Sequence, residues 1–241
     1  MLSAWVFPRG EACAWCGRPL RRELFCGQCQ QQILAWQEKY RPCRYCGRLV
    51  PLEGGTVCRQ CRLERPPFLK ARAVGSYEGL LKEMIWALKF QGRRSLANPL
   101  GRLLAGVVLR ELGPLRPELV VPVPLTGNRL RSRTFNQAEL LALALGKELG
   151  LAVMGKVLVR VRETAPQVNL SRRSRWQNLA GAFKVVLPER VAGRCLLLVD
   201  DVLTTGATAA ACTRALASAG AAGVYVVTVA TGIENFLDIS P

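Results

Sequence analysis

The sequence predicts an α/β domain with a mainly parallel sheet, preceded by a small module that folds around zinc. Two patterns support this fold class. Cysteines gather near the N-terminus in Cys-x-x-Cys pairs, and further along the chain short apolar runs alternate with segments whose apolar residues recur at helical spacing. Half of the 241 residues are hydrophobic, enough to bury a sizeable core beside a small module. A proline-rich linker around residues 65–67 divides the expected module, 1–66, from the expected domain, 67–241.

Eight of the ten cysteines form a two-fold repeat of paired sulfurs. The four pairs are Cys13/Cys16, Cys26/Cys29, Cys43/Cys46 and Cys58/Cys61. Each pair spans two corners of a tetrahedron, so two pairs supply the four thiolates of a structural zinc site. A disulfide framework is the competing interpretation, but it is typical of secreted chains, and no signal peptide is recognisable here. We therefore expect two structural Zn²⁺ ions. Sequential pairing of the knuckles is the simplest arrangement, and an interleaved one stays open.

The first half of the α/β domain is expected to hold two strands and three helices. A short apolar run predicts a strand over residues 71–77. Apolar residues at helical spacing predict helices over residues 79–90 and 95–112. A second apolar run predicts a strand over residues 119–123, and the Ala- and Leu-rich segment 136–149 predicts a helix that stops at a glycine.

The second half continues the alternation of strands and helices. Residues 157–161 are strand-like, whereas residues 162–181 are polar, basic and irregular, as expected of a loop. A buried strand is predicted over residues 196–199, followed by a helix over residues 207–218 and a last strand over residues 224–229. This alternation predicts a mainly parallel sheet.

Charge and composition narrow the classes of function. Lys and Arg total 34 against 17 Asp and Glu, a formal net charge of +17, which favours anionic partners such as phosphates or nucleic acid. The chain contains no histidine. Hydrolases that need Ser-His-Asp or Cys-His groups, and metal sites with histidine ligands, are therefore excluded.

The strongest motif joins the predicted strand 196–199 to the predicted helix 207–218. Asp200 and Asp201 follow the strand, and parallel sheets bind ligands beyond the carboxyl ends of their strands. Residues 204–208 read Thr-Thr-Gly-Ala-Thr at a helix N-terminus, where amides, hydroxyls and the helix dipole favour a phosphate group. Two acids beside such a cradle suit the hydroxyls of a sugar phosphate. The magnesium strand of an NTPase is the competing interpretation, but the chain lacks Gly-x-x-x-x-Gly-Lys-Ser/Thr.

Residues 199–208 resemble the phosphoribosyl pyrophosphate (PRPP) signature of type I phosphoribosyltransferases. The wider chain resembles the ComF family, competence-linked members of that superfamily with an N-terminal zinc ribbon. The other matching segments are residues 87–92, 121–125, 129–133, 135–138, 164–167, 170–171, 175–178 and 181–183. Thr134 and Ser174 depart from the family, which usually has glycine at the first position and often an acid at the second. The resemblance implies a type I phosphoribosyltransferase-like domain behind a double zinc-ribbon module.

The resemblance also implies a role for each site residue. Asp200 and Asp201 hold the ribose hydroxyls of PRPP and are the catalytic candidates. The residues implied to bind its phosphate groups are Thr204, Thr205, Gly206, Ala207 and Thr208 for the 5-phosphate, and Leu125, Thr126, Gly127, Arg129, Arg131 and Arg133 for the pyrophosphate. Lys89 is a further phosphate candidate. The basic segment 162–181 resembles the mobile loop that closes over PRPP, and its candidate contacts are Arg172, Arg173, Arg175 and Trp176. Mg²⁺ accompanies PRPP in this family.

Alternatives to these assignments stay open. The arginines at 129, 131 and 133 also fit an ordinary solvated face, Lys89 also suits the end of a helix dipole, and segment 162–181 also fits a flexible basic surface loop.

For function, the resemblance implies a ComF-like competence protein that binds PRPP and acts in DNA uptake and natural transformation, with single-stranded DNA and other competence proteins as candidate partners. Two alternatives are kept. The first is an active phosphoribosyltransferase that moves ribose 5-phosphate from PRPP to an unknown base or amine and releases pyrophosphate. The second is a scaffold whose ribbon binds a competence helicase or translocation partner. We expect a cytoplasmic protein without a transmembrane segment, with the inner membrane face as a candidate place of peripheral association.

Overall fold

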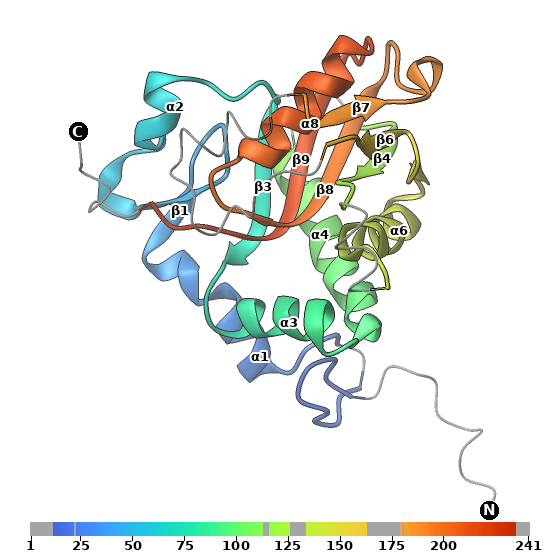
Figure 1. Cartoon of the computed structure of the whole chain (residues 1–241). Coiled ribbons are helices and arrows are strands. Elements are labelled where there is room, and N and C mark those ends of the chain that lie inside the picture. The colour runs from blue at the N-terminus through green and yellow to red at the C-terminus, as the bar shows by residue number, and fades with distance from the viewer. Residues whose placement is uncertain are drawn as a thin grey trace, which may run out of the picture.

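The structure is a computed structural model that describes residues 12–21, 23–112, 116–125, 134–162, 179 and 181–234. Its centre is a five-stranded sheet in which every pairing is parallel (Figure 1). The strands, in their order across the sheet, are β3 (Lys70–Ser76), β9 (Gly223–Thr231), β8 (Cys195–Leu203), β4 (Leu119–Pro122) and β5 (Ala152–Val153). The predicted fold class, a parallel-sheet α/β domain behind a zinc-ribbon module, is confirmed.

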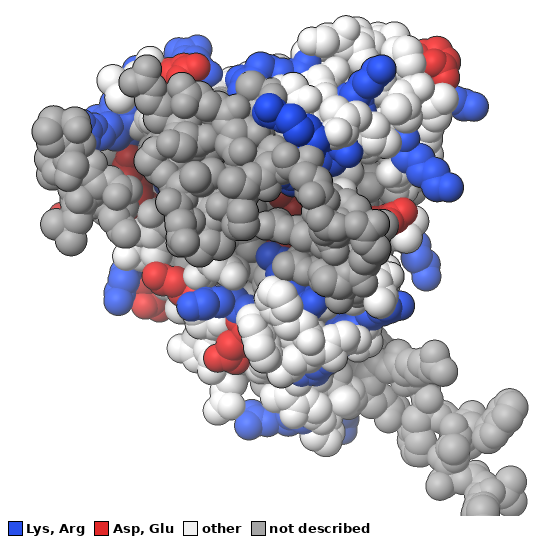
Figure 2. Space-filling view, in the orientation of Figure 1, with Lys and Arg blue, Asp and Glu red and all other residues white. Residues whose placement is uncertain are grey.

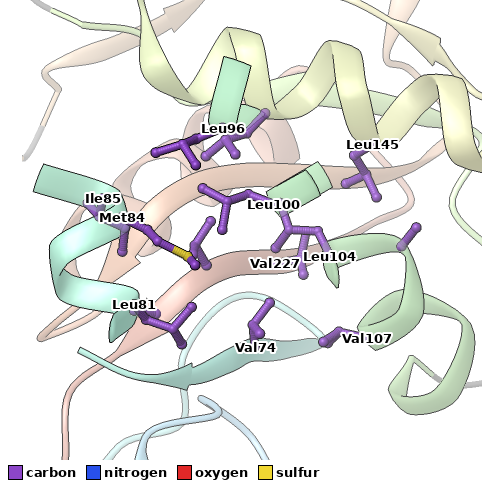
Figure 3. Packing of buried hydrophobic residues seen from close by; sticks show 14 of the residues in the cluster. Val74, Leu81, Met84, Ile85, Leu96, Leu100, Leu104, Val107, Leu145 and Val227 are labelled. Atoms are coloured by element: carbon purple, nitrogen blue, oxygen red, sulfur yellow. The ribbon is translucent and has the colours of Figure 1, made fainter. Parts of the chain in front are cut away.

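One face of this sheet is covered by three helices: α3 (Gly79–Phe90), α4 (Ala97–Glu111) and α6 (Gln137–Leu149). Figure 3 shows how Met84 and Leu104 from two of these helices pack towards Val227 of the sheet. Within the described parts of the chain, no helix is long and apolar enough to cross a bilayer.

The other face carries α8 (Ala207–Ser218) and a hairpin of β6 (Leu158–Arg160) and β7 (Phe183–Val185). Because successive side chains of a strand point to opposite faces, Leu197 packs into the cluster under α3 and α4, whereas Leu198 packs into the cluster under α8. Two short 3-10 turns, Arg94–Leu96 and Pro188–Arg190, complete the connections of this domain that the structure describes.

The predicted helices 79–90 and 207–218 have the predicted bounds.

Hydrogen bonding and backbone conformation at Asn136 and Gly150 set the two ends of α6. The side chain of Asn136 accepts a hydrogen bond from the Ala138 N–H at 3.0 Å and caps the first turn. Gly150 ends the helix at φ +67°, a left-handed conformation that favours glycine.

Several strands differ from the prediction. Residues 158–160 pair with β7 in an antiparallel hairpin and do not join the main sheet, whose edge beside β4 is taken by the two-residue strand β5. Neither β5 nor β7 was expected, because two or three residues are too few for a periodic pattern. β8 runs on to Leu203, four residues beyond the predicted 196–199, because β9 stays paired with it as far as Leu203 and Thr231.

The N-terminal module divides into two halves of similar design. The first half contains α1 (Gly27–Leu34), followed by a 3-10 turn, Ala35–Glu38. The second contains β1 (Tyr40–Pro42), β2 (Leu49–Pro51), a 3-10 turn at Leu52–Gly54 and α2 (Arg59–Leu63). Trp36, between the halves, donates from Nε1 to the Val74 carbonyl of β3 at 3.1 Å, so the module is tied to the main sheet.

The second half of the module lies directly against β3 and the C-terminal segment of the domain. The Ala71 N–H donates to the Tyr45 carbonyl at 2.8 Å, and Leu49 forms a parallel bridge with Ile233. Arg72 is buried and donates to the carbonyls of Cys43 at 3.1 Å and Ala71 at 2.8 Å, while its Nε pairs with Glu111 of α4 at 3.1 Å. Contacts therefore cross the expected domain boundary at residue 66.

The first testable prediction concerns the closeness of this contact. Gly47 has φ +68°, and a Cβ there would lie 2.4 Å from the Ala71 carbonyl oxygen. Gly47→Ala must push the knuckle away from β3, and we expect it to lower the free energy of unfolding of the zinc-loaded protein by about 3 kcal/mol. Urea unfolding measures this.

Gly17 is the matched control, because it takes the same place in the first half with φ +74° and meets nothing within 4 Å. Gly17→Ala should lower the free energy of unfolding by only about 1 kcal/mol, the strain of a left-handed alanine. Equal losses in the two variants would contradict a close contact at Gly47.

Candidate functional site

The eight paired cysteines form two four-sulfur clusters, and the pairing is sequential. One cluster is Cys13, Cys16, Cys26 and Cys29, and the other is Cys43, Cys46, Cys58 and Cys61, with the sulfur atoms of each within 4.8 Å of one another. Two Sγ–Sγ distances, 3.7 Å from Cys16 to Cys26 and 3.5 Å from Cys46 to Cys58, approach the spacing of about 3.8 Å set by tetrahedral Zn–S bonds of about 2.3 Å. Both clusters fit a structural zinc ion.

Each cluster holds a sulfur that is ready to lose its proton, as zinc binding requires. Burial raises the pKa of Cys13, but N–H donors of the Cys16 and Cys26 backbone outweigh it and lower the pKa to about 6. The Cys43 sulfur raises the pKa of Cys58, while Cys46 and Cys61 lower it, leaving the pKa at about 7. The Cys58 N–H also donates to Cys43 Sγ at 3.3 Å, which stabilises that sulfur as a thiolate.

The second candidate site lies at the centre of the main sheet, where β4 and β8 adjoin. The Val123 N–H donates to the Val199 carbonyl at 2.9 Å, so β4 ends beside the point where β8 continues. From here the connections leave in opposite directions, through α6 to β5 on one side and through α8 to β9 on the other. Such a switch point is where open parallel sheets bind ligands.

A small, solvent-open hollow lies at this end of β8. Its walls are residues 202–209, with Asp200 of β8 and Thr228 of β9. Gly206, at φ +78°, turns the chain from the strand into α8, whose first-turn amides face the same end. The Ala207 N–H donates to Thr205 Oγ1 at 3.4 Å. The structure thus brings Asp200 together with all five predicted residues of segment 204–208.

The two acids of the motif lie on opposite faces of the sheet. Asp200 lines the hollow beside α8, and its charge adds to burial, the larger cause, in raising the pKa of Cys212 on that helix. Asp201 is 5% exposed and forms an ion pair through Oδ2 with Lys89 Nζ of α3. Both acids lie within β8 and not beyond its end, so side-chain alternation separates them.

Of the other predicted site residues, Leu125 and Lys89 lie within the described ranges and the rest lie outside them. Leu125 is half-buried, three residues after β4. The predicted residues outside the described ranges are Thr126, Gly127, Arg129, Arg131, Arg133, Arg172, Arg173, Arg175 and Trp176. Lys89 forms an ion pair with Asp201, which lies in β8 beside Asp200.

Two residues near the site were missed by the sequence reasoning. Thr228 lines the hollow because its strand pairs with β8 at Asp200. Arg94 supports Thr134, the position where the family usually has glycine. Thr134 has φ +60°, which explains the preference for glycine, and its Oγ1 accepts from Arg94 Nη2 at 2.8 Å while the guanidinium lies 4.5 Å from the Phe135 ring centroid. In the sequence, the one signal for the contact between Arg94 and Thr134 was that Thr134 departs from the glycine usual in the family.

The chain is similar to a family model, to named relatives and to solved structures. A family model described as double zinc ribbon domain matches residues 2–62. The chain is 37% identical over 217 residues to the DNA utilization protein YhgH of Salmonella typhimurium, covering 89% of this chain and 94% of the relative. It is 33% identical over 187 residues to Competence protein F of Haemophilus influenzae, covering 76% and 80%. The solved glutamine PRPP amidotransferase from B. subtilis, complexed with ADP and GMP, is similar over 55% of this chain and 26% of that chain, with 19% identity and a TM-score of 0.37.

The two zinc sites should differ in how fast a chelator empties them. Cys16 is exposed, whereas all four sulfur ligands of the second cluster are buried. We expect excess chelator to remove zinc in two phases, the fast phase from the first cluster, as followed by a coloured zinc indicator. Cys16→Ser should abolish the fast phase and keep the slow one, and Cys46→Ser should do the reverse. Release of both ions in a single phase would contradict the assignment.

The Lys89–Asp201 ion pair should contribute to stability. The two side chains are 16% and 8% exposed, so Lys89→Met leaves a buried carboxylate without its counter-ion. We expect a loss of about 3 kcal/mol in the free energy of unfolding, measured with urea. Lys82→Met, at an exposed position of the same helix, should change stability by less than about 0.5 kcal/mol.

The paired variant Lys89→Met/Asp201→Leu separates the loss of the ion pair from the loss of lysine packing. Replacing both charges with apolar groups removes the unpaired carboxylate, so this variant should regain most of the lost stability. A double variant as unstable as Lys89→Met would show that the ion pair is not the cause.

Proposed function

Because the chain belongs to the ComF family, together with relatives named for competence and DNA utilization, we propose that it binds PRPP with Mg²⁺ and acts on DNA taken up by the cell. The observation that carries the proposal is the hollow at the end of β8, which combines one carboxylate with a glycine-containing turn at a helix N-terminus. That combination suits a sugar phosphate, since the carboxylate accepts hydrogen bonds from hydroxyl groups and the amides of the turn donate hydrogen bonds to a phosphate.

The ribose and the 5-phosphate of the ligand each have a counterpart in this arrangement. The ribose hydroxyls would donate to Asp200, and the 5-phosphate would accept hydrogen bonds from amides and hydroxyls of residues 204–208. Asp201 would reach a second ribose hydroxyl only by opening its ion pair with Lys89 or by sharing that lysine. Mg²⁺ prefers oxygen ligands such as carboxylates and phosphates. Bound Mg²⁺ would neutralise charge on the pyrophosphate.

Isothermal titration of PRPP and Mg²⁺ into the zinc-loaded chain tests this binding. We expect saturable binding, weakened at least about tenfold by Asp200→Asn, because a charged acceptor is lost from the hollow. Glu83→Gln, on the exposed side of α3, removes the same charge elsewhere and should bind PRPP like the unaltered chain. No binding, or equal binding by all three proteins, would overturn the proposed site.

A second candidate function, binding of single-stranded DNA, is favoured by exposed aromatic side chains on α3. Trp86 is 52% and Phe90 58% exposed, with ring centroids 6.0 Å apart. Trp86 and Trp15 of the first zinc knuckle line one open hollow of about 560 Å³, and Arg93 lies 4.8 Å from the Trp15 ring. Figure 2 shows Lys and Arg side chains spread over one face of the molecule. Aromatic rings beside cations suit unpaired bases and their phosphates.

Fluorescence anisotropy with a labelled oligothymidylate tests this second candidate. Trp86→Ala should weaken binding about fivefold or more, as expected for one stacked base, and affinity should fall steeply with added salt. Leu109→Ala, at a 76% exposed position on α4, is the control for removing an exposed apolar side chain and should leave affinity unchanged. Equal affinities of the two variants would argue against stacking on α3.

Transfer of ribose 5-phosphate and docking of a competence partner stay predictions from the resemblance.

A further inference from the structure

Asn136 links the end of β4 to the start of α6 through both groups of its side-chain amide. Its Oδ1 accepts from the Ala138 N–H at 3.0 Å, and its Nδ2 donates to the Val123 carbonyl at 3.0 Å. Val123 lies thirteen residues earlier in the chain and is 5% exposed. The side chain therefore joins two places that the backbone connects only through residues 124–135.

Capping of α6 does not by itself account for an asparagine at this position. Aspartate and serine cap helices about as well, because capping needs only a side-chain oxygen. The amide differs from both, since it presents an acceptor and, on a separate atom, a donor. The donor of Asn136 serves no group of α6, and its partner is the Val123 carbonyl of another element.

The Val123 carbonyl lies where β4 leaves the main sheet. The register of β4 with β8 ends at Pro122 and Val199, and the Val123 N–H donates to the Val199 carbonyl at 2.9 Å. A buried carbonyl beyond the end of the ladder needs another donor, and Asn136 supplies it. The direction in which the chain leaves β4 towards Leu125 is thereby fixed.

A second contact holds the residues just before Asn136. Thr134 is the one non-glycine residue with a left-handed φ in the described parts of the chain, at +60°. A β-branched residue is strained in this conformation, so the surroundings must stabilise it. Arg94 does so through its hydrogen bond to Thr134 Oγ1 and its contact with the Phe135 ring. The entry into α6 is thus fixed independently of β4, and Asn136 connects that fixed entry to the end of the strand.

We propose that Asn136 is a positioning residue for the pyrophosphate group of PRPP. The inference rests on the proposed function, in which the Leu125 amide is a candidate donor to the pyrophosphate. Asn136 acts through the Val123 carbonyl, because fixing this group fixes the backbone that leads to Leu125. The 5-phosphate belongs to residues 204–208, in the connection that follows β8. Loss of the Asn136 donor should therefore weaken binding of one end of the ligand and spare the other.

Isothermal titration of two ligands into the zinc-loaded full chain tests this separation. PRPP with Mg²⁺ carries the pyrophosphate, whereas ribose 5-phosphate lacks it. Asn136→Asp keeps the oxygen that caps α6 and removes the donor to Val123. We expect it to weaken PRPP binding at least about tenfold and to change ribose 5-phosphate affinity less than about twofold.

Asn136→Ser separates the loss of the donor from the added charge. Its hydroxyl caps the helix without introducing a carboxylate that could repel the pyrophosphate, so it should show the same split between the two ligands. Amide hydrogen exchange of the ligand-free protein separates positioning from direct contact with the ligand. The Val123 N–H should exchange at least about fivefold faster in Asn136→Ser, because the end of β4 is no longer held.

Gly150→Ala is the matched control for loss of stability. It strains the other end of α6, at a left-handed position where a Cβ meets nothing within 4 Å. The ratio of its affinities for PRPP and ribose 5-phosphate should equal that of the unaltered chain.

Three results would overturn the positioning role: PRPP binding by both Asn136 variants like that of the unaltered chain, a parallel loss of both ligands, or unchanged exchange at Val123. Failure of the proposed function has a different signature, since the unaltered chain would then bind neither ligand, and the inference would fall with it.

Discussion

The attachment of the second zinc knuckle to β3 is the contact on which the arrangement of the whole molecule depends. β3 is an edge strand, and an uncovered edge would expose unpaired backbone groups. Here the Ala71 N–H donates to the knuckle, and Arg72 binds a knuckle carbonyl while pairing with Glu111 of α4. Gly47 allows the close approach, because any side chain there would meet the Ala71 carbonyl. Zinc bound at the second cluster would thus stabilise more than the module itself, since it would hold the surface that covers the sheet edge.

The same attachment determines what lies beside the ligand loop. With the knuckle held on β3, the ribbon extends to the start of α8, and Thr205 and Gly206 become the wall between two hollows. One hollow contains Asp200 of the motif, and the other contains the buried Arg48 of the ribbon.

The extended pairing of β8 with β9 has a comparable effect on the acids. Because the strand continues to Leu203, alternation sends Asp200 to the α8 side and Asp201 to the α3 side, where Lys89 neutralises it. Two neighbouring residues thus lie in different environments: Asp200 lines a solvent-open hollow, and Asp201 is buried. The burial of Asp201 also explains why Lys89, expected to contact phosphate, lies beside a carboxylate.

Some features follow from the sequence alone because their causes are local. The Cys-x-x-Cys spacing determines two four-sulfur clusters, helical periodicity determines α3 and α8, and the glycine of the Thr-Thr-Gly-Ala-Thr run determines the turn into α8. Other features depend on which strands and knuckles meet in space. The sequential zinc pairing, the length of β8, the separation of Asp200 from Asp201 and the burial of Arg48 were decided only by tertiary structure. Each arises from contacts between segments far apart in the chain, whose partners no local pattern identifies.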